Sequence, residues 1–98
     1  MIRKVGERYS GNPVKIKQLL LDVLKPHQPD IVELSRAIAN VDGVSKVTIE
    51  IVEMDQDTES VRIEVLGSNI NIQKLLRRIR EMGASVHSID SVTAESSI

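Results

Sequence analysis

The sequence predicts an α+β fold of the ferredoxin-like type, a βαββαβ sandwich in which two helices cover one face of a four-stranded antiparallel sheet. Three observations lead to this prediction. Four segments alternate apolar and polar residues as strands do, and two segments repeat apolar residues at the helical period. The segments follow the order strand–helix–strand twice, with two halves of similar length. Right-handed crossovers then place the first and third strands at the centre of the sheet.

Composition indicates one small globular domain. The chain has 98 residues, of which 41% are hydrophobic and 28% are charged. It contains no cysteine, which excludes disulfides and thiolate metal sites and fits a reducing compartment, so we expect a cytoplasmic protein. No apolar segment approaches the roughly 20 residues that span a bilayer, so no membrane partner is expected.

The expected domain boundaries follow from where periodicity is lost. Residues 1–14 show neither helical nor strand periodicity, and we predict that they form a flexible N-terminal extension. The ferredoxin-like domain is expected over residues 15–94. Residues 95–98 are expected to be a C-terminal tail.

The first half of the domain begins with a strand predicted over residues 15–24, which is apolar on both faces as an interior strand should be. Two prolines in KPHQPD end this strand, and Asp30 is placed to cap a helix with an apolar stripe over residues 31–41. Two further strands are predicted around residues 47–52 and 61–66. The polar segment MDQDTE between them predicts a hairpin.

The second half continues with a helix whose apolar stripe covers residues 72–82, and Asn71 or Asn69 is placed to cap it. Gly83 stands where a helix takes its left-handed C-terminal residue. The last strand is predicted over residues 84–93. Its apolar residues are three apart, which breaks strict alternation, so we expect a bulge or an irregular edge strand.

One face of the predicted sheet is too aliphatic for a face left in water. Nine residues are expected to face the helices: Leu19, Leu21, Val23, Val47, Ile49, Ile51, Val61, Ile63 and Val65. The opposite, open face then carries four large aliphatic residues, and contiguous exposed aliphatic residues mark an interface. We therefore predict a homo-oligomer contact formed by Leu20, Asp22, Leu24, Glu50, Val52, Arg62, Glu64 and Leu66. The alternatives are a solvated face, in which the acids pair with the arginine across strands, and a ligand groove.

The predicted hairpin is acidic, and three of its carboxylates have a spacing found in cation sites. Asp55, Asp57 and Glu59 are two apart, in the way that oxygen ligands surround Ca²⁺ in a loop. The loop has no glycine for the sharp turn and no glutamate at the twelfth position, so a solvated acidic loop is the alternative. Ca²⁺ or another divalent cation is the only cofactor that we consider.

Three other groups of polar residues receive structural interpretations. The KPHQPD loop is interpreted as a rigid turn, because Asp30 already occupies the donors that an anion would use. His87 and Asp90, even with Asp22, provide too few ligands for a transition-metal site. A basic face on the second helix is either solvated or pairs with the acidic hairpin of a neighbouring copy, and it consists of Lys74, Arg77, Arg78 and Arg80.

Several functions are excluded by what the sequence lacks. RNA-recognition domains of this fold stack bases on aromatic residues, whereas this chain has one tyrosine and no other aromatic residue. The net charge of −1 provides no general attraction for nucleic acid. A metallochaperone would need a Cys-x-x-Cys loop. No spacing of a nucleophile and a base is recognisable, so we do not expect an enzyme.

The segments LLLDVLKPHQPDIVELSRAIANVDGV, VTIEIVEMDQDTESVRIEVLG and EMGASVHSIDSV resemble an archaeal family known as domain of unknown function 211. The resemblance covers about residues 15–94. It implies a ferredoxin-like fold, an archaeal cytoplasmic setting and self-association into rings or larger assemblies. It implies no enzyme activity.

Two functions are consistent with these observations. The first is an uncharacterised, non-enzymatic domain that assembles with copies of itself into a ring-like homo-oligomer with a structural or scaffold role. The second is a regulatory module that binds a small ligand or a divalent cation such as Ca²⁺ at a subunit interface.

Overall fold

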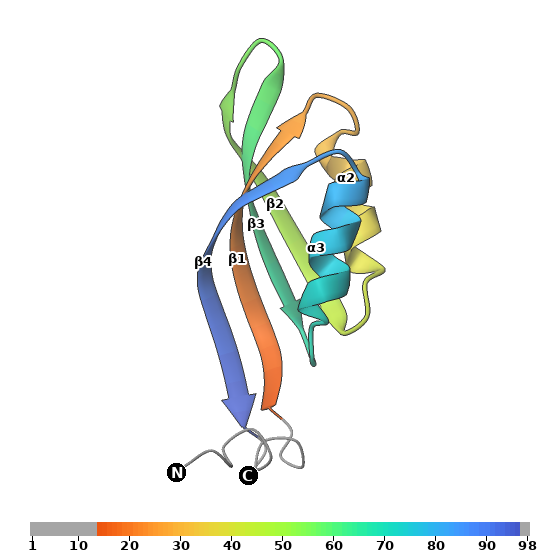
Figure 1. The fold of residues 1–98 in the computed structure, drawn as a ribbon, viewed down its shortest axis with the longest axis vertical. Helices are drawn as coiled ribbons and strands as arrows, with labels where there is room; N and C mark the ends of the chain where they lie inside the picture. The colour runs from red at the N-terminus through yellow and green to blue at the C-terminus, as the bar shows by residue number, and fades with distance from the viewer. Residues whose placement is uncertain (1–13, 97–98) are drawn as a thin grey trace.

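A computed structural model describes residues 14–96 and confirms the predicted fold (Figure 1). The elements are β1 (Val14–Pro26), α2 (Ile31–Ala39), β2 (Val44–Met54), β3 (Thr58–Gly67), α3 (Ile72–Glu81) and β4 (Ser85–Ser96). The strands form one sheet in the order β2-β3-β1-β4, and all neighbouring pairs are antiparallel. The first and third strands are therefore central, as predicted.

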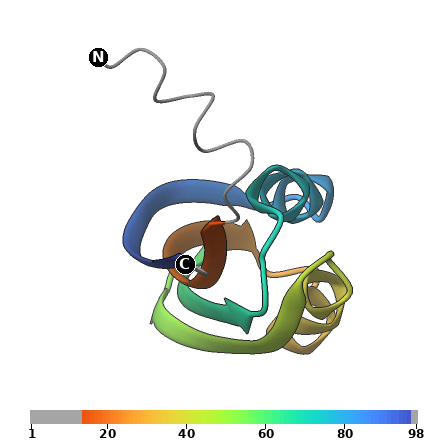
Figure 2. The same cartoon turned by 90° about the horizontal axis from the view of Figure 1, so that it is seen from below.

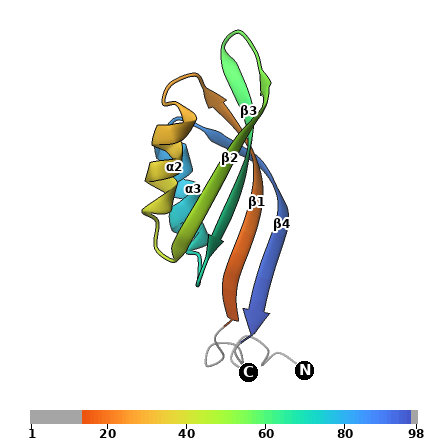
Figure 3. The same cartoon turned by 180° about the vertical axis from the view of Figure 1, so that it is seen from behind.

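Both helices lie on one face of the sheet, which curls around that side (Figures 2 and 3). The core lies between the two layers and is entirely aliphatic. The buried hydrophobic residues that form it are Leu19, Leu21, Val23, Leu34, Ile38, Val41, Val61, Ile63, Val65, Ile70, Leu75, Ile79 and Ala84. Within residues 14–96, neither helix has the length and hydrophobicity needed to cross a membrane.

The helix ends follow the predicted capping signals. The Asp30 side chain accepts a hydrogen bond from the Glu33 N–H at 2.9 Å, and Asn71 accepts one from the Lys74 N–H at 3.0 Å. These bonds satisfy donors that the first turn of a helix leaves unpaired. Gly83 follows α3 with φ of 87°, the left-handed conformation that was expected at this position.

The loops that follow α2 and β3 cross at very close range. Gly43 has φ of 85°, and a Cβ atom there would lie 1.8 Å from the Asn69 carbonyl oxygen. A Cβ atom on Gly67 would lie 1.9 Å from the Gly43 oxygen, which accepts a hydrogen bond from the Ser68 N–H. The Asn69 side chain caps no helix and instead accepts a hydrogen bond from the Ile16 N–H. Only glycine fits where these two backbones meet.

β1 and β4 are longer than predicted at their outer ends. Val14 pairs with Ser96, so the strand pair includes the last residue of the predicted extension. It also includes Glu95 and Ser96 of the predicted tail, because pairing with β1 satisfies their backbones in a way that local sequence does not reveal. The rest of the predicted extension and tail, residues 1–13 and 97–98, lies outside the described residues.

The irregularity predicted for β4 is confirmed. Its pairing with β1 shifts register at three places. As a result, Val86, Ile89 and Val92 all pair with core residues of β1 although they are three apart. Their partners are Val23, Leu21 and Leu19.

Candidate functional site

The predicted interface residues lie together on the open face of the sheet, opposite the helices. Asp22 pairs with Arg62 and Leu20 with Glu64 across β1 and β3, and β2 adds Glu50 opposite Arg62. The arginine is thus flanked by carboxylates on both neighbouring strands. Its Nη1 atom lies 3.7 Å from Glu50 Oε1, so the expected cross-strand pairing is confirmed for this acid. Both side chains are exposed, and such pairs contribute little to stability.

The four aliphatic residues of the open face differ in exposure. Leu20 and Leu66 are half-buried by their neighbours on the sheet. Leu24 and Val52 are 44% and 55% exposed. Both residues that pair with Leu24 are serines, which are too small to cover it. The uncovered apolar surface of this face therefore lies towards the β2–β3 hairpin.

The two edge strands expose further aliphatic side chains that were not predicted. Ile51 was expected to face the helices, and it does pair with buried Val61, but it remains 41% exposed. Met54 on the same strand and Ile89 and Val92 on β4 are exposed as well. Alternation assigns a side chain to one side of a sheet, but it does not say how far the helices extend over that side.

Two hollows lie on either side of the first residues of β4. A groove of about 480 Å³ lies between α3 and β4 and is lined by aliphatic side chains together with an arginine, a histidine and two serines; we call it the α3–β4 groove. Its main lining residues are Leu76, Arg80, Ala84, Val86, His87 and Ile89. A hollow of about 240 Å³ on the open side is lined by residues that include Leu24, Ser60 and His87.

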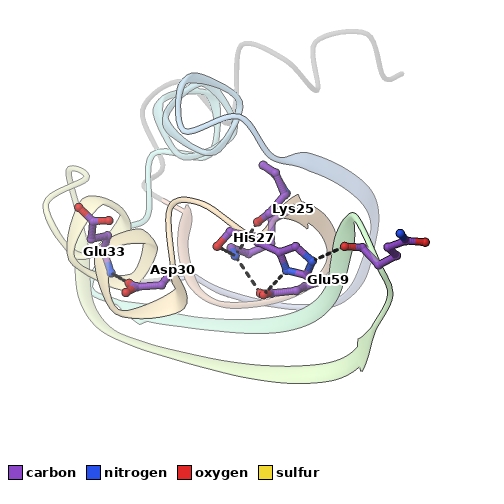
Figure 4. Close-up of polar contacts among 7 residues, drawn as sticks. Lys25, His27, Asp30, Glu33 and Glu59 are labelled. Carbon is purple, nitrogen blue, oxygen red and sulfur yellow. Dashed lines mark hydrogen bonds and ion pairs between the residues drawn. The ribbon is translucent and has the colours of Figure 1, made fainter.

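The structure does not bring together the three carboxylates considered as cation ligands. Asp55 and Asp57 are exposed at the hairpin turn, whereas Glu59 is buried and directed towards β1 (Figure 4). Within residues 14–96, no group of three or more histidine, aspartate or glutamate side chains is arranged to hold a metal ion. His87 and Asp90 therefore belong to no such group either. The Asp90 carboxylate accepts a hydrogen bond from the Ser88 hydroxyl at 2.7 Å.

Glu59 instead belongs to a polar cluster with Lys25 and His27, in which Lys25 and Glu59 are buried and the His27 side chain is 40% exposed (Figure 4). Lys25 is 1% exposed, and its Nζ atom donates to Glu59 Oε1 at 2.9 Å and to the Pro26 carbonyl at 2.7 Å. The His27 ring lies between two acceptors, with Nδ1 2.9 Å from Glu59 Oε2 and Nε2 2.8 Å from the Gln56 carbonyl. Both acceptors are satisfied only when both ring nitrogens carry a proton.

The charges of the cluster support one another. The hydrogen bond to Glu59 raises the pKa of His27 above its ordinary value of 6.5, and the Gln56 carbonyl adds to this effect. Hydrogen bonds from His27 and then from Lys25 lower the pKa of Glu59 below its ordinary value of 4.5. The cluster thus ties the end of β1 to the β2–β3 hairpin through ionised groups.

The sequence contained a signal for this cluster that was not used. Lys25 continues the core-facing register of β1 two residues after Val23, and Glu59 precedes Val61 by two residues in the core-facing register of β3. Two opposite charges at the ends of paired apolar registers predict a buried ion pair. The Asp30 cap at the end of this loop is confirmed, but β1 continues through Lys25 and Pro26, which were expected to lie in the turn and instead pair with Glu59 and Thr58.

The basic face of α3 is exposed to solvent. Lys74 pairs with Asp42 at 2.6 Å, and this pairing lowers the pKa of the aspartate. Arg78 pairs with Glu81 one turn later at 3.4 Å. Arg80 lies at the α3–β4 groove, which places a cation beside exposed aliphatic side chains.

Comparisons with known proteins give one family and one relative. The model of the DUF211 family, described as uncharacterized ArCR, matches residues 17–98. An uncharacterized protein of the archaeon Methanocaldococcus jannaschii is 33% identical over 79 residues, which is 81% of each chain. The resemblance noted in the sequence is therefore confirmed.

Proposed function

This chain belongs to the DUF211 family, and we propose that it functions as a cytoplasmic homo-oligomer with a structural or scaffold role and no enzymatic activity. The position of the large exposed hydrophobic residues carries the proposal. Of eight such residues in the described part of the chain, seven lie on strands and five of these lie on the two edge strands. The remaining one is Val32 on α2.

Exposed aliphatic residues that cluster on a sheet favour association. Isolated exposed hydrophobic residues are common on monomers, but a contiguous group marks an interaction surface. Ile51, Val52 and Met54 lie within four residues at the end of β2, which is an edge strand with an unpaired backbone. Fully burying an exposed side chain of this size contributes about 1.5–3 kcal/mol, and these three are about half exposed, so each contributes roughly half of that and several together support a stable contact.

The polar cluster of Lys25, His27 and Glu59 supports a structural role. A catalytic group must face its substrate, whereas Lys25 and Glu59 are buried and bonded to groups of the same chain. Among the described residues that are not exposed, every buried polar side-chain atom has a hydrogen-bond partner. These groups therefore stabilise the fold of the chain. The proposed partner, a second copy of the chain, rests on the exposed aliphatic residues.

Light scattering coupled to size exclusion tests the proposal. We expect the wild-type mass to be a multiple of 10.9 kDa. Leu24→Glu places a charge in the exposed apolar surface of the sheet and should shift the mass towards the monomer. Val32→Glu is the matched control, because Val32 is 54% exposed but lies on a helix, and its mass should equal that of the wild type. A monomeric wild type would contradict the proposal.

The α3–β4 groove favours binding of a small ligand. The second candidate function is therefore a regulatory module that binds a small ligand at a subunit interface, with the divalent cation considered from the sequence as the other possible ligand. The same mass measurement separates the two functions when it is repeated with Ca²⁺ and with EDTA. A mass that is the same in both solutions favours the scaffold. A mass that changes with Ca²⁺ favours the regulatory module.

A further inference from the structure

We propose that the copies associate head to tail, with the end of β2 in one copy docked against the start of β4 in the next. This inference rests on the proposed homo-oligomer and assigns two different surfaces to it. The first surface, the β2 end, consists of residues 51–54. The second, the β4 start, consists of residues 85–89 together with the α3–β4 groove.

Strand register places the two surfaces at the same level along the strands, on opposite edges of the sheet. Ile51 of β2 pairs with Val61, which pairs with Val23 of β1. Val23 in turn pairs with Val86 of β4. These four residues form one row across the sheet. A second copy displaced sideways along this row therefore brings its β4 start to the β2 end of the first copy.

Strand direction permits the same arrangement. The four strands alternate in direction across the sheet, so β2 and β4 are antiparallel to each other (Figure 1). When a copy is displaced sideways, its β4 lies beside β2 of its neighbour with the polarity of an antiparallel pair. The helices of both copies remain on the same side, so the helix-side surfaces of the two edges meet.

The shapes of the two surfaces match on the helix side. Ile51 pairs with a core residue and Met54 pairs with buried Glu59, so both side chains lie on the helix side, where they are exposed. The α3–β4 groove lies on that side of β4, and Leu76 and Val86 are among its aliphatic lining residues. Two protruding apolar side chains on one edge thus face an apolar groove on the other.

On the open side of the sheet, an exposed side chain of the β2 end likewise matches a hollow at the β4 start. Register shifts on β2 between Ile51 and Glu53, which leaves Val52 as the extra residue of a bulge, 55% exposed. At the corresponding height on β4, the hollow of about 240 Å³ exposes Leu24 behind the small residue Ser85. A neighbour's Val52 placed there would cover the most exposed leucine of the open face.

Charge complementarity identifies a second copy as the occupant of the groove. The turn that adjoins the β2 end carries Asp55 and Asp57, both exposed. The groove carries the cation of Arg80 beside its aliphatic residues. Opposite charges around an apolar centre favour the correct partner and fix its orientation. The hairpin of this chain has both the apolar and the acidic groups that the groove fits.

A head-to-tail contact has a consequence that a face-to-face contact lacks. Each copy uses one surface of each kind, so the two surfaces are chemically different and a variant can lose one while keeping the other. Ile51→Glu damages only the β2 end, and Ile89→Glu damages only the β4 start. A mixture of the two variants still contains one intact pair of surfaces.

Sedimentation velocity on these variants tests the inference. Each variant alone should be monomeric, and an equimolar mixture should form a dimer and nothing larger. Val32→Glu should assemble as the wild type does, and circular dichroism should show that all variants are folded. Variants that remain monomers on mixing, or that assemble on their own, would overturn the head-to-tail contact.

Failure of the proposed function gives a different result. A monomeric wild type would overturn both the homo-oligomer and the contact. A wild-type oligomer that survives Ile51→Glu but dissociates with Leu20→Glu would retain the homo-oligomer and overturn the contact in favour of the open face. Leu20 is the appropriate probe because it lies at the centre of that face, opposite Glu64.

Discussion

The two ends of the sandwich share two features, a glycine and an ion pair, but the tightly packed feature is the glycine at one end and the ion pair at the other. Each end has a glycine with positive φ and a lysine paired with a carboxylate. Where β2 begins, Gly43 is packed against backbone, and the Lys74 ion pair lies in solvent. Where β4 begins, the nearest atom to a Cβ placed on Gly83 is 3.8 Å away, whereas the Lys25 ion pair is buried.

The difference shows that the two ends are held together by different forces. At the first end the backbones of two loops are in contact, and the charges are incidental. At the second end side chains join the end of β1 to the hairpin, and the glycine only completes a helix. The first end should therefore tolerate loss of its ion pair but not a methyl group added at Gly43. The second end should tolerate a methyl group added at Gly83 better than it tolerates loss of its ion pair.

The largest expected effect comes from Gly43→Ala compared with Gly83→Ala. Both alanines would adopt a left-handed conformation, which costs about 1–2 kcal/mol. At Gly43 the methyl group would also lie 1.8 Å from the Asn69 oxygen, so the backbone must move. We expect a loss of more than about 3 kcal/mol for Gly43→Ala and only the conformational cost for Gly83→Ala. Urea unfolding measures both, and equal losses would contradict the comparison.

The next effect comes from Lys25→Met compared with Lys74→Met. The first substitution removes a partner from a buried carboxylate, which should lower the melting temperature by roughly 10 °C or more. The second removes an exposed ion pair and should change the melting temperature by no more than a few degrees. Thermal unfolding followed by circular dichroism measures both variants. Similar losses would show that burial does not distinguish the two lysines.

The smallest effect is a pH dependence confined to the second end. Because the pKa of His27 is raised, its contribution to stability is fully present below pH 6.5 and is lost as the pH rises through the raised value. The pKa of Glu59 is lowered, so its contribution is present above pH 4.5 and is lost as the pH falls through the lowered value. The stability difference between the wild type and His27→Gln should thus be greatest between pH 4.5 and 6.5.

Urea unfolding of the wild type and of His27→Gln at a series of pH values measures this difference. A difference between wild type and His27→Gln that does not vary with pH would contradict the role assigned to the histidine.

Local signals predicted most of the fold. The order of elements, the Asp30 cap and the left-handed Gly83 depend on residues close in sequence, and all three were predicted correctly. The ends of the sheet depend on pairing between β1 and β4, which are some 80 residues apart at Val14 and Ser96. Local pattern does not reveal such a pairing, so the two strands extend beyond the residues predicted for them.

The candidate site was predictable in part. Alternation correctly assigned Leu24 to the open face and Ile51 to the helix side, whereas Val52 is the extra residue of a bulge and has no register partner. The exposure of Ile51 depends on how far the helices cover the sheet, which is a property of packing. The role of Glu59 depends on a lysine 34 residues away in sequence, so a local spacing of carboxylates indicated a cation site instead.

Hydrogen–deuterium exchange of the wild-type chain at increasing protein concentration tests most directly whether copies associate through the sheet edges. We expect concentration-dependent protection of residues 51–54 and 85–89, with no change on α2 around Val32. Exchange that is independent of concentration at both edges would contradict the account.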